Sequence, residues 1–391
     1  MPQQAPIVYL DNAATSFPKP SQVLRRMLED YASLGVSPGR GSHDLSRRAE
    51  DYVSLARQRL CGLFGGDAPE RVIFAYNATE ALNLLIQGLL GPGDQVLSTR
   101  LEHNSVLRPL HHLRQAGVIS LDLAPFDSQG LIDPAWFARA IGPRTRLVIV
   151  NHASNVLGVV QPVAAIGQVC RQRGVPLVLD VSQSAGLAPI DMTAWGVAAL
   201  AFTGHKALQG PTGIGGAVIS RDLEVRPSRF GGTGLDSHSL VHPRDYPHRL
   251  EAGTINILGV MGLMAGLDYL EGQGWERVRQ REMVLWQRLR DGLAGLPGLT
   301  LYAAQDGPER VPVLSCNLAG MDPADLGQIL DGDYGIAVRG GLHCAPLLHQ
   351  DLGTGRAGAL RFSLGPLNSQ DDVDQALAAM TAIAHAKSSS K

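Results

Sequence analysis

The sequence predicts an α/β fold in which a mostly parallel β-sheet is covered by helices on both faces. Three observations lead to this prediction. Short runs of apolar and β-branched residues recur between residues 71 and 220. Within each run the apolar residues are continuous rather than alternating, which indicates strands buried on both faces. Helix-like segments separate the runs, and this alternation of strands and helices is typical of a parallel sheet.

The individual elements follow in chain order. Six apolar runs that end in turn or polar residues are predicted as strands: 71–77, 95–100, 146–152, 175–183, 199–204 and 215–220. The intervening segments predicted as helices are 78–90, 104–115, 134–141 and 162–173. The first of these helices has a start signal, because Asn77 is suited to cap it and Glu80 follows three residues later.

The pattern changes beyond about residue 255. Residues 257–293 are predicted to form one or two long helices. Weaker strand candidates follow at 310–318, 335–340 and 358–364, and a final amphipathic helix is predicted at 370–386, before a short tail that we expect to be frayed. We therefore expect a large α/β domain followed by a smaller α+β domain.

Composition restricts the classes of partner. The formal net charge is −2 and 18% of the residues are charged, so neither nucleic acid nor an anionic membrane is an expected partner. Uncharged stretches such as 147–170 are interrupted by polar residues and Pro, which argues against membrane spans. The N-terminal residues lack a signal-peptide pattern, and the few cysteines do not suggest a disulfide framework: Cys61, Cys170, Cys316 and Cys344. We expect a cytoplasmic protein with reduced thiols.

Polar residues at the ends of the predicted strands are the candidates for chemistry, because ligands gather at the carboxyl ends of parallel strands. The amides of Ala78 and Thr79, with the Thr79 hydroxyl, lie at a helix N-terminus, which suits a phosphate. Asp180 ends the most apolar strand, and Gln183 follows it. The next strand ends at a third group of polar residues, Thr203, His205 and Lys206.

These three features together fit pyridoxal 5′-phosphate (PLP). Lys206 lies in an apolar and glycine-rich stretch, 199–218, that contains no carboxylate. A buried ammonium is costly there unless it is paired, neutral or covalently modified. PLP needs donors for its phosphate, a carboxylate for its ring nitrogen and a lysine for its Schiff base. The sequence therefore predicts a PLP site with Lys206 as the Schiff-base residue.

The chain also resembles the class V aminotransferase family of fold-type I PLP enzymes, in order from about residue 8 to 370. The motifs that carry the resemblance are YLDNAATSFPKP, RGSHDLS, NATEALNLL, EHNSVLRPL, NHASNVLGVVQPV, LVLDVSQSAG, FTGHKALQGPTGIGG, RLEAGTINILG and VRGGLHCAP. The resemblance is to the cysteine desulfurase branch, which includes selenocysteine lyase-like members. It implies a seven-stranded sheet in the large domain. The implied division is an N-terminal segment at 1–16 that associates with the small domain, a large domain at 17–258 and a small domain at 259–391.

The resemblance also implies roles for the cofactor site. Lys206 matches the Schiff-base lysine, Asp180 the partner of the ring nitrogen, Gln183 the partner of the phenolic oxygen, and His103 the imidazole stacked on the ring. The residues that match ligands of the phosphate are Ala78, Thr79, Thr203 and His205, together with Thr254, which matches a residue reaching the site of the neighbouring subunit. A homodimer is therefore implied, and no metal is expected.

The reaction-specific residues are implied in the same way. Cys344 matches the nucleophilic cysteine of the short-loop motif, and its position between Gly-Gly and Pro suits a loop that presents a side chain. Basic neighbours at His343 and Arg339 are expected to favour its thiolate. Arg361 matches the arginine that binds the substrate α-carboxylate. The other implied substrate contacts are Ala14, His43, Asn155 and Arg339, and Asn155 also matches a polar residue near the cofactor oxygen. One departure is Leu342, where many short-loop members have a second histidine.

The function we expect is conversion of L-cysteine into L-alanine, with the sulfur held as a persulfide on Cys344 and passed to an acceptor protein or a small thiol. The first alternative is a selenocysteine lyase acting on L-selenocysteine. The second is another reaction of the family, such as transamination, epimerisation or kynurenine cleavage. The third is a non-enzymatic scaffold that binds a sulfur carrier. Intact Lys206, Asp180, Gln183 and His103 argue against the scaffold.

Overall fold

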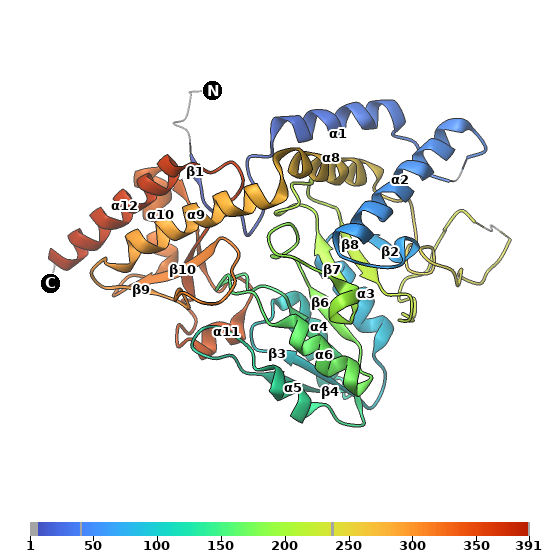
Figure 1. Cartoon of the computed structure of the whole chain (residues 1–391), viewed down its shortest axis with the longest axis horizontal. Coiled ribbons are helices and arrows are strands. Elements are labelled where there is room, and N and C mark those ends of the chain that lie inside the picture. The colour runs from blue at the N-terminus through green and yellow to red at the C-terminus, as the bar shows by residue number, and fades with distance from the viewer. Residues whose placement is uncertain (1–6, 40, 236–237, 390–391) are drawn as a thin grey trace.

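The computed structural model describes residues 7–39, 41–235 and 238–389 (Figure 1). The large part is built on a seven-stranded sheet with the order β2-β8-β7-β6-β5-β3-β4. These strands are β2 (Val72–Ala75), β3 (Asp94–Thr99), β4 (Ile119–Ala124), β5 (Thr145–Asn151), β6 (Leu177–Asp180), β7 (Val197–Thr203) and β8 (Gly215–Ile219). All neighbours pair in parallel except β8, which is antiparallel to both β2 and β7. The mostly parallel sheet is confirmed.

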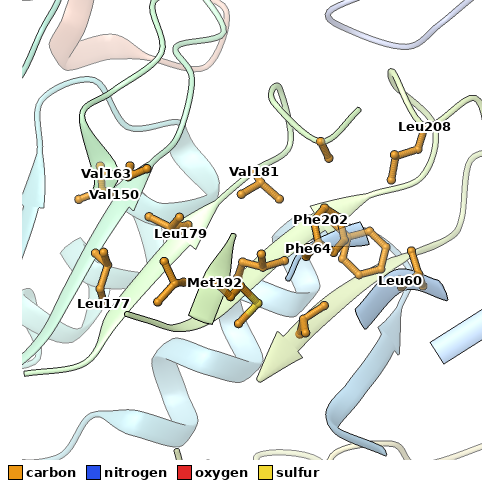
Figure 2. Close-up of a cluster of buried hydrophobic side chains, with 14 of the residues drawn as sticks. Leu60, Phe64, Val150, Val163, Leu177, Leu179, Val181, Met192, Phe202 and Leu208 are labelled. Atoms are coloured by element: carbon orange, nitrogen blue, oxygen red, sulfur yellow. The ribbon is translucent and has the colours of Figure 1, made fainter. Parts of the chain in front are cut away.

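Helices cover both faces of this sheet. They are α2 (Asp44–Leu63), α3 (Ala78–Leu89), α4 (Asn104–Gln115), α5 (Pro134–Ala140), α6 (Val163–Arg173) and the short α7 (Met192–Trp195). The side chains of β6 alternate between two cores, because Leu177 and Leu179 belong to one hydrophobic cluster and Val178 belongs to another. The first cluster, which also contains Phe64 and Phe202, is drawn in Figure 2. Burial on both faces is the reason for the continuous apolar runs in the sequence.

The smaller part contains an antiparallel sheet of four strands with the order β12-β13-β10-β9. Its strands are β9 (Leu299–Leu301), β10 (Val313–Leu318), β12 (Arg339–Gly341) and β13 (Ala359–Ser363). The helices of this part are α9 (Trp275–Ala294), α10 (Pro323–Tyr334), α11 (Pro346–Asp351) and α12 (Gln370–Ser389). The N-terminal strand β1 (Val8–Tyr9) pairs in parallel with β11 (Ile336–Ala337), so the start of the described chain joins this smaller part.

The long helical stretch forms two helices, α8 (Ile257–Gln273) and α9, which are separated by Gly274. α8 packs beside α1 (Ser21–Leu34) along one edge of the molecule (Figure 1) and contributes to the core of the large sheet, whereas α9 contributes to the core of the small part. The change from one core to the other therefore lies between these helices. The predicted boundary at 258/259 falls inside α8 and stays a prediction, as does the boundary at 16/17.

Three details differ from the sequence-based expectation. The strand predicted at 335–340 is two short strands, β11 and β12, which belong to different sheets. The strand predicted from residue 310 begins only at Val313. Helix α12 extends to Ser389, so the tail that we expected to be frayed is helical up to that residue, and 390–391 lie outside the described residues. No described helix is both long and apolar enough to cross a membrane.

Candidate active site

A cavity of about 280 Å³ lies at the carboxyl ends of β6 and β7, where the large sheet meets the small part. It brings together most of the predicted cofactor residues: Ala78, Thr79, His103, Asn155, Asp180, Gln183, Thr203, His205 and Lys206. The predicted reaction and substrate residues that line the same cavity are Ala14, Arg339, Cys344 and Arg361. The topology explains this gathering, because parallel strands place their carboxyl ends at one edge of the sheet.

Two predicted residues lie elsewhere. His43 is exposed at the start of α2, where its Nδ1 accepts a hydrogen bond of 3.2 Å from the Ser46 amide. Thr254 is exposed and lines a separate hollow that also contains Glu80 and Arg229. Neither side chain lines the cavity of its own chain.

The end of the cavity beside α3 fits a phosphate. Asn77 Oδ1 caps α3 by accepting a 3.0 Å hydrogen bond from the Glu80 amide, so Ala78 and Thr79 form the first turn of the helix at the cavity wall. Thr203 Oγ1 and His205 Nδ1 are buried and have no hydrogen-bond partner among the described residues. Buried polar atoms without partners are costly, and an anion at a helix N-terminus would satisfy them.

The middle of the cavity fits a protonated aromatic ring. Asp180 ends β6 and is buried, and its Oδ1 accepts hydrogen bonds from the amide and the hydroxyl of Ser182. His103 caps α4 by accepting a 3.1 Å hydrogen bond from the Ser105 amide. Burial lowers the pKa of His103 to about 4, so its imidazole is neutral at neutral pH. A neutral imidazole and a buried carboxylate match the predicted roles in stacking and in holding a ring nitrogen.

Lys206 lies in the loop that follows β7. Burial lowers the pKa of its amine to about 8, with Arg361 and Arg339 adding to the decrease and Asp180 opposing it. The backbone of this loop is held by Ser16, whose amide donates to His205 O at 3.1 Å and whose hydroxyl donates to Lys206 O at 2.9 Å. The structure therefore places an amine with an appreciable neutral fraction at physiological pH beside Asp180.

The lowered pKa predicts how PLP binding depends on pH. Only the neutral amine attacks an aldehyde, so the rate at which added PLP becomes attached to Lys206 should rise with pH and level off above about 8. An ordinary exposed lysine, with a pKa near 10.4, would give a rate that rises well beyond that pH. Stopped-flow absorbance of the cofactor-free protein mixed with PLP measures this profile. A rate that still increases tenfold per pH unit between pH 8.5 and 9.5 would contradict the placement of Lys206.

Cys344 is the one cysteine among the described residues that lines the cavity. It lies in a turn between β12 and α11, is partly exposed and lines the cavity. The other three cysteines are buried in α2, α6 and β10, and burial raises their pKa values, to about 12 for Cys170 and Cys316. Their thiols are therefore poor nucleophiles. Cys344 therefore differs from the three packed cysteines in both position and burial.

The turn that carries Cys344 is fixed on both sides. His343 and Cys344 have left-handed φ values of +48° and +59°. The amide of Asn104 donates to Cys344 O at 2.7 Å, and the side chain of Asn155 donates to His343 O at 2.7 Å. One expectation is wrong here. His343 is buried and burial lowers its pKa to about 2, so its imidazole is neutral and supplies no positive charge to the thiolate. Arg339 remains as a basic neighbour in the cavity wall.

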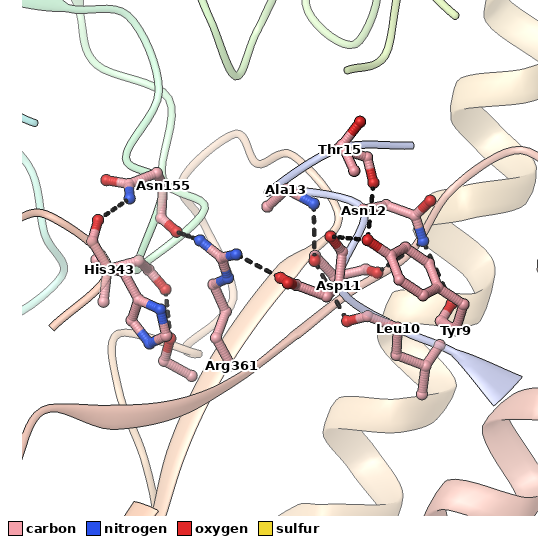
Figure 3. Close-up of polar contacts among 12 residues, drawn as sticks. Tyr9, Leu10, Asp11, Asn12, Ala13, Thr15, Asn155, His343 and Arg361 are labelled. Atoms are coloured by element: carbon pink, nitrogen blue, oxygen red, sulfur yellow. Dashed lines mark hydrogen bonds and ion pairs between the residues drawn. The ribbon is translucent and has the colours of Figure 1, made fainter. Parts of the chain in front are cut away.

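Arg361 lies on β13 and is buried at the wall of the cavity (Figure 3). Its Nη1 donates to the backbone oxygen of Asn155 at 3.0 Å, and its Nη2 donates to Asp11 Oδ1 at 2.6 Å. Its Nε has no partner among the described residues. A buried guanidinium with a free donor suits a carboxylate ligand. Sequence reasoning assigned no role to Asp11, although it lies within the YLDNAAT motif.

The chain is similar to known proteins over nearly its whole length. The family model for aminotransferase class-V matches residues 8–376. A protein of Methanothermobacter thermautotrophicus named probable cysteine desulfurase is 37% identical over 361 residues, which cover 90% of this chain and 89% of that protein. The cysteine desulfurase of Pectobacterium atrosepticum is 33% identical over 388 residues, which cover 97% and 93% of the two chains.

A solved structure is also similar. The apo structure of cysteine desulfurase from Thermococcus onnurineus NA1 aligns with a TM-score of 0.89 at 34% identity, covering 97% of this chain and 95% of that one. The family match and the identities over nearly the full length lead to one conclusion. This chain belongs to the class V aminotransferase family.

Proposed function

We propose that this protein is a PLP-dependent cysteine desulfurase, which converts L-cysteine into L-alanine and takes the sulfur as a persulfide on Cys344. The relatives named above as cysteine desulfurases support the reaction. The observation that carries the proposal is the presence in one cavity of Cys344, Lys206 and Asp180. A reducing compartment such as the cytosol suits this chemistry, because Cys344 must remain a thiol between turnovers.

The cavity has a place for each part of PLP. Lys206 would hold its aldehyde, Asp180 its ring nitrogen, and Thr203 and His205, with the first turn of α3, its phosphate. When bound, the cofactor supplies an electron sink that makes the α-proton of an amino acid acidic. The family is PLP-dependent, and the unpartnered atoms of Thr203 and His205 are the observation that fits the group.

Side chains of the protein would then bind the substrate, transfer protons and accept the sulfur. Arg361 binds the substrate carboxylate and orients the α-carbon toward the amine of Lys206, which removes and returns protons. The thiolate of Cys344 attacks the substrate sulfur. A bond forms between the two sulfur atoms, and the Cβ–S bond breaks with its electron pair remaining on Cβ. That carbon takes a proton and becomes the methyl group of L-alanine, and the persulfide on Cys344 passes to an acceptor protein or a small thiol.

The experiment that tests the function follows both products. Protein loaded with PLP and supplied with L-cysteine and a reducing thiol should release L-alanine and sulfide in equal amounts. Binding of L-cysteine without L-alanine formation would contradict the proposal. The names of the relatives favour cysteine over selenocysteine, and Cys344→Ala distinguishes the two substrates. A selenocysteine lyase would keep its activity on L-selenocysteine in that variant, since selenium release can proceed without an enzymic thiol.

Replacing Asp180 by Asn should lower turnover by roughly 10²-fold or more, because the neutral amide cannot keep the ring nitrogen protonated. Asn has nearly the same shape as Asp and can still accept the hydrogen bonds from Ser182, so the fold should persist. Steady-state rates of L-alanine formation measure the effect, and far-ultraviolet circular dichroism serves as the control for folding. A variant with the wild-type rate would leave Asp180 with only a structural role.

We also propose that the protein is a homodimer in which Thr254 reaches the phosphate site of the neighbouring subunit. Its position in a hollow away from the cavity of its own chain is consistent with this arrangement. Sedimentation of the PLP-loaded protein should therefore give a dimer, and dilution into the monomer range should release the cofactor. A monomer that retains PLP at low concentration would contradict the shared site.

A further inference from the structure

The ion pair between Asp11 and Arg361 has no role in the reaction described so far. Arg361 is only 1% exposed, and Asp11 supplies the one carboxylate that is bonded to its guanidinium in the described structure. Asn155 O accepts from Nη1 and Asp11 Oδ1 accepts from Nη2, so the planar group is held from two sides (Figure 3). Nε is left without a described partner in a residue that lines the cavity.

Asp11 is itself held in place by backbone pairing. The amide of Ser363 donates to Leu10 O at 2.7 Å, and the amide of Asn12 donates to Ser363 O at 3.2 Å. Ser363 lies two residues after Arg361 on β13, so the N-terminal segment runs alongside the strand that carries the arginine. The position of the Asp11 carboxylate is therefore coupled to the position of Arg361 through backbone as well as side-chain contacts.

The same N-terminal segment also forms hydrogen bonds with residues of the large part that line the cavity. The side chain of Gln183 donates to Ala13 O at 3.0 Å. Ser16 donates to the backbone oxygens of His205 and Lys206. Asp11 thus belongs to a short segment that joins the strand of Arg361 to the loop of Lys206.

We propose that Asp11 is a positioning residue, which holds Arg361 in the orientation that receives the α-carboxylate and so makes the site selective for α-amino acids over amines without a carboxylate. The inference rests on the proposed function, since it takes Arg361 as the carboxylate ligand. Without the Asp11 carboxylate, the guanidinium of Arg361 would lose the acceptor that fixes its plane, and a two-point contact with a substrate carboxylate depends on that plane.

The competing explanation is that the ion pair only stabilises the fold. The two explanations differ in which ligands are affected. A positioning role predicts weaker binding only for ligands that carry a carboxylate, whereas a purely structural role predicts the same change for every ligand that binds in the cavity, or no change at all.

The experiment compares L-alanine with L-alaninamide, in which a neutral amide replaces the carboxylate. Each compound is titrated into the PLP-loaded wild-type protein and into Asp11→Ala, and binding is followed by the absorption of the bound cofactor. We expect Asp11→Ala, which removes the acceptor that fixes the guanidinium plane, to bind L-alanine about tenfold more weakly, the loss typical of one charge-assisted hydrogen bond. L-alaninamide should change by less than about twofold, because it makes no ion pair with Arg361.

Asp374→Ala is the matched control, because Asp374 forms an ion pair with Arg288 on the surface of the small part and should leave both affinities unchanged. Equal weakening of both ligands, or no weakening of L-alanine, would overturn the proposal. If Asp11→Ala does not fold, Asp11→Glu keeps the carboxylate and moves it by one methylene, and the same selective loss is expected. A different result would contradict the proposed function itself: wild-type protein that binds L-alanine but forms no L-alanine from L-cysteine.

Discussion

Replacing Lys206 by Ala should lower L-alanine formation by roughly 10³-fold or more, because the cavity then lacks the amine that holds the cofactor and moves the α-proton. The described structure has no second lysine in the cavity wall. Borohydride reduction of the PLP-loaded wild-type protein should attach the cofactor to the peptide that contains Lys206, and the variant should give no such peptide. Steady-state assays and peptide mapping measure the two effects.

Lys387→Ala is the matched control, since Lys387 lies in the last turn of α12, far along the chain from the site. Lys387→Ala should form L-alanine at the wild-type rate, and borohydride should still attach PLP to the peptide that contains Lys206. A Lys206→Ala protein within tenfold of the wild-type rate would exclude Lys206 from the chemistry, whatever its position in the cavity.

Replacing Cys344 by Ser should leave amino-acid binding intact and lower L-alanine formation from L-cysteine by about 10²-fold or more, because a hydroxyl is a much weaker nucleophile toward sulfur than a thiolate. The two side chains are similar in size, so the turn fixed by Asn104 and Asn155 should persist. The cofactor absorption should respond to L-cysteine in the variant as it does in the wild type, which separates binding from sulfur transfer.

Cys61→Ala tests whether any cysteine would have the same effect. Cys61 is buried in α2, away from the cavity, and its replacement should not change the rate per folded molecule. If Cys344→Ser forms L-alanine from L-cysteine as fast as the wild type, Cys344 is not the sulfur acceptor, and direct release of sulfide becomes the better description.

The central strands could be predicted from the sequence because strands buried on both faces consist almost entirely of apolar residues. β5, β6 and β7 are covered on both faces and read as continuous apolar runs. The edge strand β4 was not among the predicted runs, because the exposed residues Ser120 and Asp122 interrupt its apolar residues. Helix α1 was also missed, since it mixes polar and apolar residues and packs through one narrow apolar face.

The candidate site was predictable in two different ways. Asp180 and Lys206 could be placed together from the sheet alone, because both follow parallel strands. The roles of Cys344 and Arg361 were predicted only from the family resemblance. Both residues belong to the small part, and no sequence pattern shows that the small part packs against the edge of the large sheet that carries Asp180 and Lys206. Asp11 had no signal that pointed to a role, because its partner Arg361 is 350 residues away. The error at His343 has a physical cause as well, because the sequence could not show that its imidazole is buried.

The most direct test of the account locates the transferred sulfur. PLP-loaded protein is incubated with L-cysteine in the absence of a reducing thiol, and its intact mass and peptides are measured before and after treatment with a reductant. The account predicts the addition of one sulfur atom, on the peptide that contains Cys344, and its removal by the reductant. Sulfur on a peptide with Cys61, Cys170 or Cys316, or full L-alanine production with no sulfur on any cysteine, would contradict it.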